Sequence, residues 1–152
     1  MHKEITSKSP GNTLNIGAKL AKNLRKGDII CLLGQLGSGK TVLTKGIAQG
    51  LGIAPGKIVS PSFVLMRQYN RSRLPLYHFD LYRLKLAKDI ASLGYEEYFY
   101  DEGVSVVEWA DRLGCLLPKE YLRIELAIKS DSQRVFKLQA FGSRYKELLE
   151  RI

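Results

Sequence analysis

The sequence contains little cysteine and no long hydrophobic run. Its two cysteines among 152 residues, Cys31 and Cys115, lie far apart and form no C-x-x-C pair. We therefore expect two reduced, buried thiols and no disulfide scaffold. No apolar run reaches the roughly 20 residues needed to span a bilayer, and residues 1–10 lack the apolar stretch of a signal peptide. These absences argue against a membrane-spanning or secreted protein and favour a cytoplasmic one.

The sequence also lacks internal repeats, low-complexity segments and Ser/Gly-rich linkers. A chain of 152 residues is long enough to bury roughly two thirds of its unfolded surface in one core. We therefore expect a single domain that spans residues 1–152.

Acidic residues are outnumbered by basic ones. The chain has 24 Lys and Arg against 15 Asp and Glu, which gives a formal net charge of +9. Such an excess favours polyanionic neighbours such as nucleotides, RNA or an acidic protein surface. The basic residues are scattered, and no RRM, KH or basic-arm pattern accompanies them. This distribution favours ordinary solvated faces over direct reading of nucleic acid.

Apolar residues in the first third of the chain follow patterns typical of alternating helices and strands. In residues 13–24 they recur at helical spacing, with Asn12 or Thr13 as the expected cap. Residues 28–34 include a continuous apolar run, which is typical of a strand covered on both faces. Residues 40–53 again show helical spacing.

The remaining sequence continues this alternation. The predicted elements are strands at 62–69 and 74–82 around a polar turn at 70–73, a helix at 87–99, a strand at 103–110, a hairpin of 121–128 with 134–141, and a closing helix at 143–152. Together these elements predict an α/β fold with a largely parallel sheet flanked by helices and a C-terminal antiparallel hairpin.

The stretch "GQLGSGKT" at residues 34–41 matches G-x-x-x-x-G-K-[ST] and lies between a predicted strand and a predicted helix. Its glycines allow successive backbone N–H groups to curl around phosphate oxygens at a helix N-terminus. Lys40 would contact the outer phosphates, and the Thr41 hydroxyl would bind Mg²⁺. The motif therefore predicts a P-loop NTPase-like fold. The nucleotide-contacting residues that we expect in it are Gly34, Gln35, Leu36, Gly37, Ser38, Gly39, Lys40, Thr41 and Val42.

A P-loop needs an acidic partner at the end of a neighbouring strand, to hold the magnesium ion or its water. Glu108 ends the apolar stretch "VSVVE", and Asp80 ends "PLYHFD", in which Leu76, His78 and Asp80 point to one side. We expect Glu108 and Asp80 to serve in this role. A helix cap or a surface ion pair is the alternative for each.

Four stretches together resemble the bacterial TsaE (YjeE) family over nearly the whole chain. They are "GQLGSGKT" at 34–41, "VSPSF" at 59–63, "HFDLYRL" at 78–84 and "VEWADRLGCLLP" at 107–118. The resemblance implies a small ATPase that uses ATP and Mg²⁺ and works with the TsaB and TsaD proteins. The reaction served is threonylcarbamoylation of adenosine 37 in tRNAs that read codons starting with A, so tRNA is reached indirectly through that complex.

Family resemblance also assigns roles to single residues. It implies Lys40, Glu108 and Asp80 as catalytic residues and Thr41, Glu108 and Asp80 as metal ligands. Ser60, Pro61 and Ser62 match a switch-like segment in which a hydroxyl meets the metal or the γ-phosphate. Trp109 would border the nucleotide, although a core or partner-facing ring is an equal alternative.

Three positions depart from the family pattern. Many relatives have aspartate at Gln35 and a hydroxyl residue at Val42, and Ala110 replaces a frequent proline. Neither of the first two changes touches the backbone nest or Lys40. We therefore expect nucleotide binding to survive while the hydrolysis rate differs from that of relatives.

Two other classes of function remain open from the sequence. One is a small-molecule kinase in which Arg67, Arg71 and Arg73 form a phosphate lid, although little chain is left for an acceptor pocket. The other is a nucleotide-gated binding module with negligible turnover. A GTPase is disfavoured because the chain lacks an N/T-K-x-D guanine-reading stretch.

Overall fold

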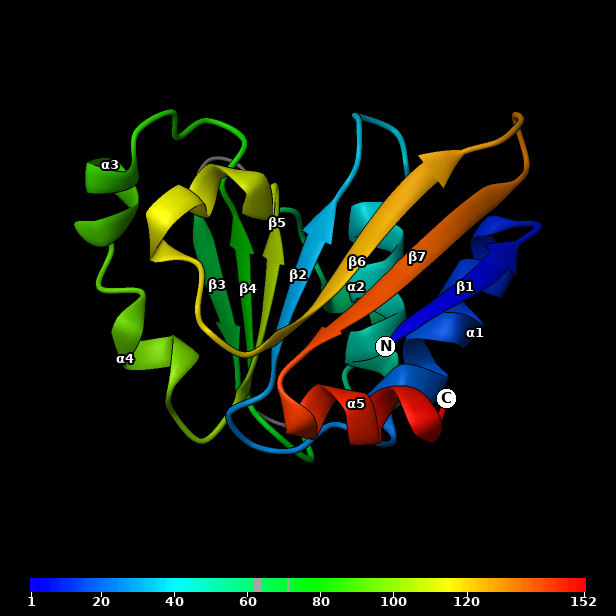
Figure 1. Ribbon diagram of the computed structural model, residues 1–152, viewed down its shortest axis with the longest axis horizontal. Helices are drawn as coiled ribbons and strands as arrows, with labels where there is room; N and C mark the ends of the chain where they lie inside the picture. The colour runs from blue at the N-terminus through cyan, green and yellow to red at the C-terminus, as the bar shows by residue number, and fades with distance from the viewer. Residues whose placement is uncertain (62–63, 71) are drawn as a thin grey trace.

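The computed structural model describes residues 1–61, 64–70 and 72–152. Figure 1 shows a twisted sheet with helices on both of its sides. In chain order the elements are β1 (His2–Ser7), α1 (Pro10–Ala21), β2 (Ile29–Leu33), α2 (Lys40–Gly50), η1 (Pro55–Lys57), β3 (Met66–Tyr69), β4 (Leu76–Asp80), α3 (Ala87–Ala91), α4 (Glu96–Phe99), β5 (Val104–Glu108), η2 (Ala110–Leu116), β6 (Tyr121–Ile128), β7 (Arg134–Phe141) and α5 (Ser143–Glu150), where η denotes a 3₁₀ helix. Among the described residues, no helix has the length and apolar character that a membrane crossing requires.

The strands of this sheet lie in the order β1-β7-β6-β2-β5-β4-β3. Strand β2 is parallel to both β5 and β6, and β4 is parallel to β5. The edges are antiparallel, where β7 pairs with β1 and β6, and β3 pairs with β4. The predicted α/β fold, with its parallel centre and its β6–β7 hairpin, is therefore confirmed.

Helices cover both faces of strand β2. Its side chains alternate, so Ile30 and Leu32 join a core with α1 and α2, whereas Ile29 and Cys31 join a core with α3, α4 and η2. In Figure 1 α1 and α2 lie behind the sheet, and α3 and α4 lie at its left-hand end. Burial on both faces explains why the sequence of β2 is continuously apolar.

Helix α1 begins earlier than the sequence pattern predicts. Its cap is Ser9, whose hydroxyl accepts a hydrogen bond from the Asn12 N–H at 3.0 Å, and Pro10 opens the first turn. Proline suits this position because it has no N–H to satisfy and its φ is already helical. The predicted cap at Asn12 or Thr13 is therefore wrong.

Two other differences concern segments in which tertiary contacts decide the structure. Strand β1 was not predicted, because only its last residue, Ser7, is buried and its backbone pairing with β7 holds it. The predicted helix at 87–99 is divided into α3 and α4, with Gly94 between them at a φ of 67°. In the predicted strand 62–69, Val64 and Leu65 precede strand β3, which begins at Met66, and residues 62 and 63 lie outside the described part.

The two cysteines have different environments. Cys31 is buried, and its burial raises the pKa of the thiol to about 12. Cys115 is exposed on η2, where Ala110 and Leu113 take the buried positions. The expectation of two buried thiols is therefore correct for Cys31 and wrong for Cys115.

Candidate functional site

The segment 34–41 connects the carboxyl end of β2 to the start of α2. Its backbone requires glycine at Gly34, because a Cβ there would lie 2.6 Å from the Leu126 carbonyl oxygen. Gly39 precedes α2 with a φ of 100°, and no side chain caps the helix N-terminus. The first N–H groups of α2 thus lack a side-chain acceptor, which is the arrangement that binds an anion.

Lys40 is buried at the start of α2 and its ammonium turns back on the loop. Its Nζ donates to the carbonyl oxygens of Gly34 at 2.6 Å and Gln35 at 3.0 Å. The same atom lies 4.1 Å from the centroid of the Trp109 ring. Burial lowers the pKa of Lys40, and the nearby carboxylates of Glu108 and others oppose this by favouring the charged form.

The two predicted acids lie side by side. Asp80 and Glu108 end β4 and β5 and are directly paired in the parallel register. The Thr41 hydroxyl donates to Glu108 Oε2 at 3.1 Å, and the Ser60 hydroxyl donates to Asp80 Oδ2 at 3.3 Å. The fold therefore brings two carboxylates and two hydroxyls to one edge of the sheet, beside Lys40.

The carboxylates and hydroxyls gathered here offer only oxygen atoms as metal ligands, which suits a hard cation such as Mg²⁺. Among residues 1–61, 64–70 and 72–152, no group of three or more His, Cys, Asp or Glu side chains is placed to hold a metal ion. A magnesium ion here would therefore need the Thr41 hydroxyl, water or phosphate oxygens in addition to carboxylates. That requirement matches the usual partial hydration of Mg²⁺ in nucleotide sites.

A pocket of about 480 Å³ opens between these groups. It is lined by Leu36, Gly37, Gly39, Lys40, Thr41, Val42, Ser60, Asp80, Tyr82, Arg83, Glu108 and Trp109. Most of the residues expected from the sequence are thus brought together, and Ser60, which was placed in the switch-like segment, joins them.

Three of the expected residues that the structure describes do not line this pocket. Gly34 and Gln35 border a separate hollow on the β6 side, which Trp109 also lines. Ser38 is buried, with its hydroxyl 3.4 Å from the Lys40 Nζ. Ser62 lies outside the described residues, so the structure does not place it.

Trp109 takes a left-handed backbone conformation directly after β5, with φ 57° and ψ 42°. Its ring contacts that of Tyr82, with centroids 4.9 Å apart. This conformation is costly for a large side chain, and strained residues of this kind concentrate at functional sites. The ring forms a wall of the pocket and faces the Lys40 ammonium.

For some side chains around the pocket, no functional role was predicted from the sequence. Tyr82 and Arg83 belong to the "HFDLYRL" stretch, and only Asp80 within it was singled out. His78 and Thr44 lie behind Glu108 and contact its Oε1 at 2.8 Å and 3.3 Å. The strand alternation that puts His78 on the same side as Asp80 was the available signal, but it does not reveal a contact with a neighbouring strand.

The β6–β7 turn also reaches the loop. Arg134 Nη2 donates to the Gly37 carbonyl oxygen at 3.2 Å, while its Nη1 donates to the Ser130 carbonyl oxygen at 2.8 Å. One guanidinium thus joins the hairpin turn to the middle of the glycine segment. This contact spans 97 positions in sequence, so spacing could not predict it.

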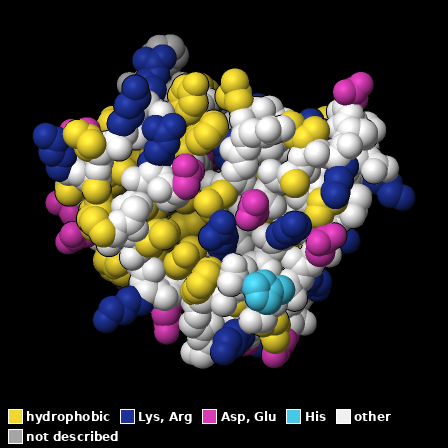
Figure 2. Space-filling view, turned by 45° about the horizontal axis from the view of Figure 1, so that its top comes forward, with side chains coloured by type: hydrophobic (Ala, Val, Ile, Leu, Met, Phe, Trp, Pro, Cys, Tyr) yellow, Lys and Arg dark blue, Asp and Glu magenta, His cyan; other side chains and the backbone are white. Residues whose placement is uncertain are grey.

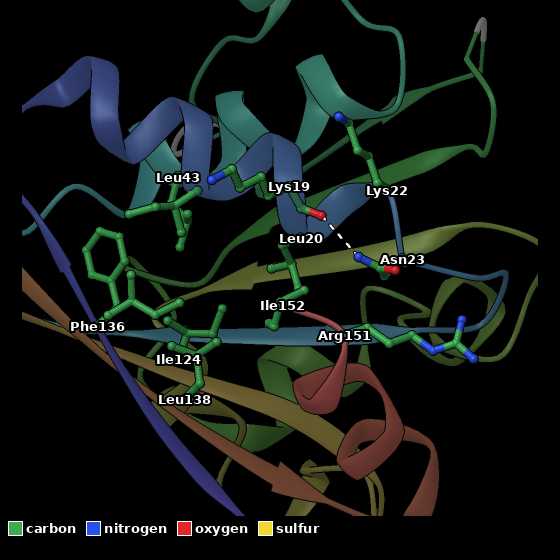
Figure 3. Close-up of a pocket in the computed structure, with 12 residues that line it drawn as sticks. Lys19, Leu20, Lys22, Asn23, Leu43, Ile124, Phe136, Leu138, Arg151 and Ile152 are labelled. Carbon is green, nitrogen blue, oxygen red and sulfur yellow. Dashed lines mark hydrogen bonds between the residues drawn. The ribbon is translucent and has the colours of Figure 1, made fainter.

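A second pocket, of about 420 Å³, lies between α1 and the sheet. Figure 3 shows that the side chains around it are mainly apolar, including Leu20, Leu43, Ile124 and Phe136. The described residues that line it include no Asp or Glu, and its charged side chains are those of Lys19, Lys22 and Arg151. The convergence of opposite charges and hydroxyls therefore singles out the pocket beside Lys40 as the candidate site.

The chain is similar to several known proteins over most of its length. The family model described as "Threonylcarbamoyl adenosine biosynthesis protein TsaE" matches residues 7–136. The tRNA threonylcarbamoyladenosine biosynthesis protein TsaE of Bacillus subtilis is 41% identical over 145 residues, which cover 95% of this chain and 89% of that protein. The protein of the same name from Treponema pallidum is 39% identical over 128 residues, which cover 84% of this chain and 93% of that protein.

A solved structure agrees with these matches. The crystal structure of Bacillus subtilis YdiB is similar with a TM-score of 0.87 and 39% sequence identity, and the match covers 99% of this chain and 93% of that one. The sequence motifs, the fold and the relatives all lead to the same assignment. This chain belongs to the TsaE family of tRNA threonylcarbamoyladenosine biosynthesis proteins.

Proposed function

We propose that this TsaE-family protein is a Mg²⁺-dependent ATPase that drives tRNA threonylcarbamoylation at adenosine 37 together with TsaB and TsaD. The observation that carries the proposal is the meeting of Lys40, Thr41, Glu108 and Asp80 in one pocket. Lys40 and Thr41 lie at the start of helix α2, and Asp80 and Glu108 end the parallel strands β4 and β5, in the region where α/β folds bind ligands.

The nucleotide phosphates would bind against the N-terminus of α2. The Lys40 ammonium donates hydrogen bonds to the Gly34 and Gln35 carbonyl oxygens. It would exchange these contacts for phosphate oxygens, which are stronger acceptors because they carry charge.

A bound magnesium ion would neutralise phosphate charge and link the nucleotide to the protein. Thr41, Glu108 and Asp80 would hold it directly or through water. The Glu108 carboxylate lies 3.1 Å from the Thr41 hydroxyl, so it can orient a metal-bound water or an attacking water. Its contribution would be largest in the transition state, where charge develops on the transferred group.

The kinase alternative has less support. The Arg73 guanidinium donates to the Ala21 carbonyl oxygen at 2.6 Å and is therefore bound at the end of α1. Arg67 is exposed on strand β3, and Arg71 lies outside the described residues. The described lining of the pocket therefore includes neither Arg67 nor Arg73, and its guanidinium is that of Arg83.

Exposed hydrophobic side chains beside the site support a partner there. Leu36 and Tyr82 line the pocket and are 74% and 46% exposed, and Leu86 is 52% exposed. Figure 2 shows hydrophobic side chains gathered on the part of the surface formed by α3, α4 and η2. Apolar surface next to a functional pocket is typical of a protein interface.

The proposal is tested by phosphate release from a panel of ATP, GTP, CTP and UTP, with and without Mg²⁺ and with small-molecule hydroxyl acceptors. We expect Mg²⁺-dependent release of phosphate to water, with ATP preferred. Transfer of phosphate to an acceptor would favour the kinase. Binding without turnover, even when TsaB and TsaD are added, would favour the nucleotide-gated module.

A further inference from the structure

His78 lies behind the candidate site, with no exposed surface, in the middle of strand β4. Its Nε2 is 2.8 Å from Glu108 Oε1. A carboxylate accepts hydrogen bonds and cannot donate one, so Nε2 carries the hydrogen and donates it. The contact joins the adjacent strands β4 and β5. The candidate metal ligands Asp80 and Glu108 lie at the carboxyl ends of these two strands.

The two oxygens of Glu108 therefore face different neighbours. Oε1 is held from the interior by His78, and the Thr44 hydroxyl, which donates to the Lys40 carbonyl oxygen at 2.9 Å, lies 3.3 Å from it. Oε2 faces outward to the Thr41 hydroxyl at 3.1 Å. Because Oε1 is fixed toward the interior, the plane of the carboxylate is fixed as well. Oε2 is therefore directed at Thr41, a candidate magnesium ligand.

The remaining nitrogen of His78 argues against a role in folding alone. His78 Nδ1 is buried and has no hydrogen-bond partner among the described residues. A buried polar atom without a partner costs stability, and a leucine at this position would avoid that cost. A leucine, however, cannot donate a hydrogen bond to Glu108.

We propose that His78 is the positioning residue of Glu108, which orients the carboxylate for Mg²⁺ by donating from Nε2. This inference rests on the proposed Mg²⁺-ATPase function. It assigns His78 no contact with the nucleotide, and its effect passes entirely through Glu108.

Two amide substitutions separate this role from simple filling of space. In His78→Gln the amide nitrogen takes about the place of Nε2, whereas in His78→Asn it takes about the place of Nδ1 and does not reach Glu108. We expect His78→Asn to lower kcat and raise the Mg²⁺ concentration for half-maximal activity, each by about tenfold or more, as losing a group that orients a metal ligand commonly does. We expect His78→Gln to stay within about threefold of the parent in both.

Other readouts locate the effect at Glu108. Nucleotide affinity without Mg²⁺, measured by calorimetry, should be the same in both variants and the parent. In a Glu108→Gln background, His78→Asn should lower kcat by less than about twofold, because residues that act through one another are not additive. Melting temperatures of the two amide variants check that both are folded.

Several results would overturn the inference. A folded His78→Asn protein with parent kcat and parent Mg²⁺ requirement rejects it, and so does a folded His78→Gln protein that loses tenfold. The second result decides the matter even if the Asn variant does not fold. Failure of the proposed function looks different, because the parent itself would then show no Mg²⁺-dependent turnover with or without its partners.

Discussion

At the scale of single residues, Lys40 is placed to act on phosphate but is engaged by its own loop. We expect Lys40→Ala to weaken Mg-ATP binding by about 2 kcal/mol, close to a thirtyfold loss of affinity, because a charge-assisted contact disappears. The net loss of affinity is limited because Lys40 must give up its hydrogen bonds to the Gly34 and Gln35 carbonyl oxygens when it binds phosphate.

Calorimetry measures this effect, and Lys45→Ala is the matched control. Lys45 lies on the same helix but does not line the pocket, so its removal takes away one charge at a distance from the phosphates. Parent affinity in a folded Lys40→Ala protein would show that the nucleotide binds elsewhere.

The carboxylates should affect turnover more than binding. We expect Glu108→Gln to lower the rate of ATP hydrolysis by tenfold or more while much of the nucleotide affinity remains, because a carboxylate that orients metal and water acts mainly as charge develops. Asp80→Asn should act in the same direction and less strongly, since Asp80 contacts Ser60 and the Tyr82 N–H but not Thr41. Steady-state phosphate release at saturating ATP checks both, and parent rates in both variants would remove them from the mechanism.

At the scale of elements, α1 and α2 pack so closely that glycine is required between them. A Cβ on Gly46 of α2 would lie 2.4 Å from the Leu14 carbonyl oxygen of α1. We expect Gly46→Ala to lower the free energy of unfolding by about 1–3 kcal/mol, because forcing a methyl into a packed backbone contact separates the helices. Helix α2 begins at Lys40, so this packing also supports the candidate site.

Gly11→Ala provides the comparison for this prediction. Gly11 also lies in a helix, but a Cβ there would meet only the Ser9 hydroxyl, at 3.8 Å. Alanine should therefore be neutral or stabilise by up to about 1 kcal/mol through the unfolded chain. Urea denaturation of both variants measures the difference, and equal effects would mean that the α1–α2 contact relaxes without cost.

The sequence predicted those elements whose pattern is set locally. The continuous apolar run of Ile29–Leu33 and the three valines of Val104–Glu108 were sufficient to recognise buried strands. The alternation in the β6–β7 hairpin was equally clear. Strand β1 gave no such signal, because it is held by main-chain pairing with β7, and main-chain hydrogen bonds do not depend on side-chain identity.

The same distinction applies to the candidate site. Lys40 and Thr41 follow from a motif in which every residue is near in sequence. Asp80 and Glu108 could be predicted because the ends of parallel strands meet at one edge of a sheet. His78 and Arg134 could not, since their contacts with Glu108 and Gly37 depend on which strands are neighbours and on how far one hairpin turn extends.

At the scale of the whole molecule, the candidate site is open and is bordered by apolar side chains. Leu36 and Tyr82 would lose contact with water if a partner covered the pocket. Burial of apolar surface favours such docking, and the excluded water would strengthen the electrostatic contacts of Lys40 and Glu108. A partner that binds here would therefore affect both ATP affinity and turnover.

We expect the isolated protein to hydrolyse ATP slowly and to be stimulated when TsaB and TsaD are added. By linkage, ATP should also tighten formation of the complex by the same factor by which the complex tightens ATP binding. Phosphate release with increasing TsaB and TsaD, and calorimetry of complex formation with and without ATP, measure the two effects. Fast release by the protein alone, unchanged at saturating partner concentration, would point to an independent enzyme.

The net charge of +9 predicts that such an association would be sensitive to salt. A positively charged protein that docks to an acidic partner surface or to nearby tRNA is steered by long-range attraction, which ions screen beyond about 8 Å at physiological ionic strength. We expect the association rate to fall as salt rises from about 50 to 300 mM while the dissociation rate changes less, because steering acts before contact and apolar packing acts after it. Stopped-flow association measured across this range separates the two rates. An association rate that does not depend on salt would mean that the basic residues are solvated faces without a part in docking.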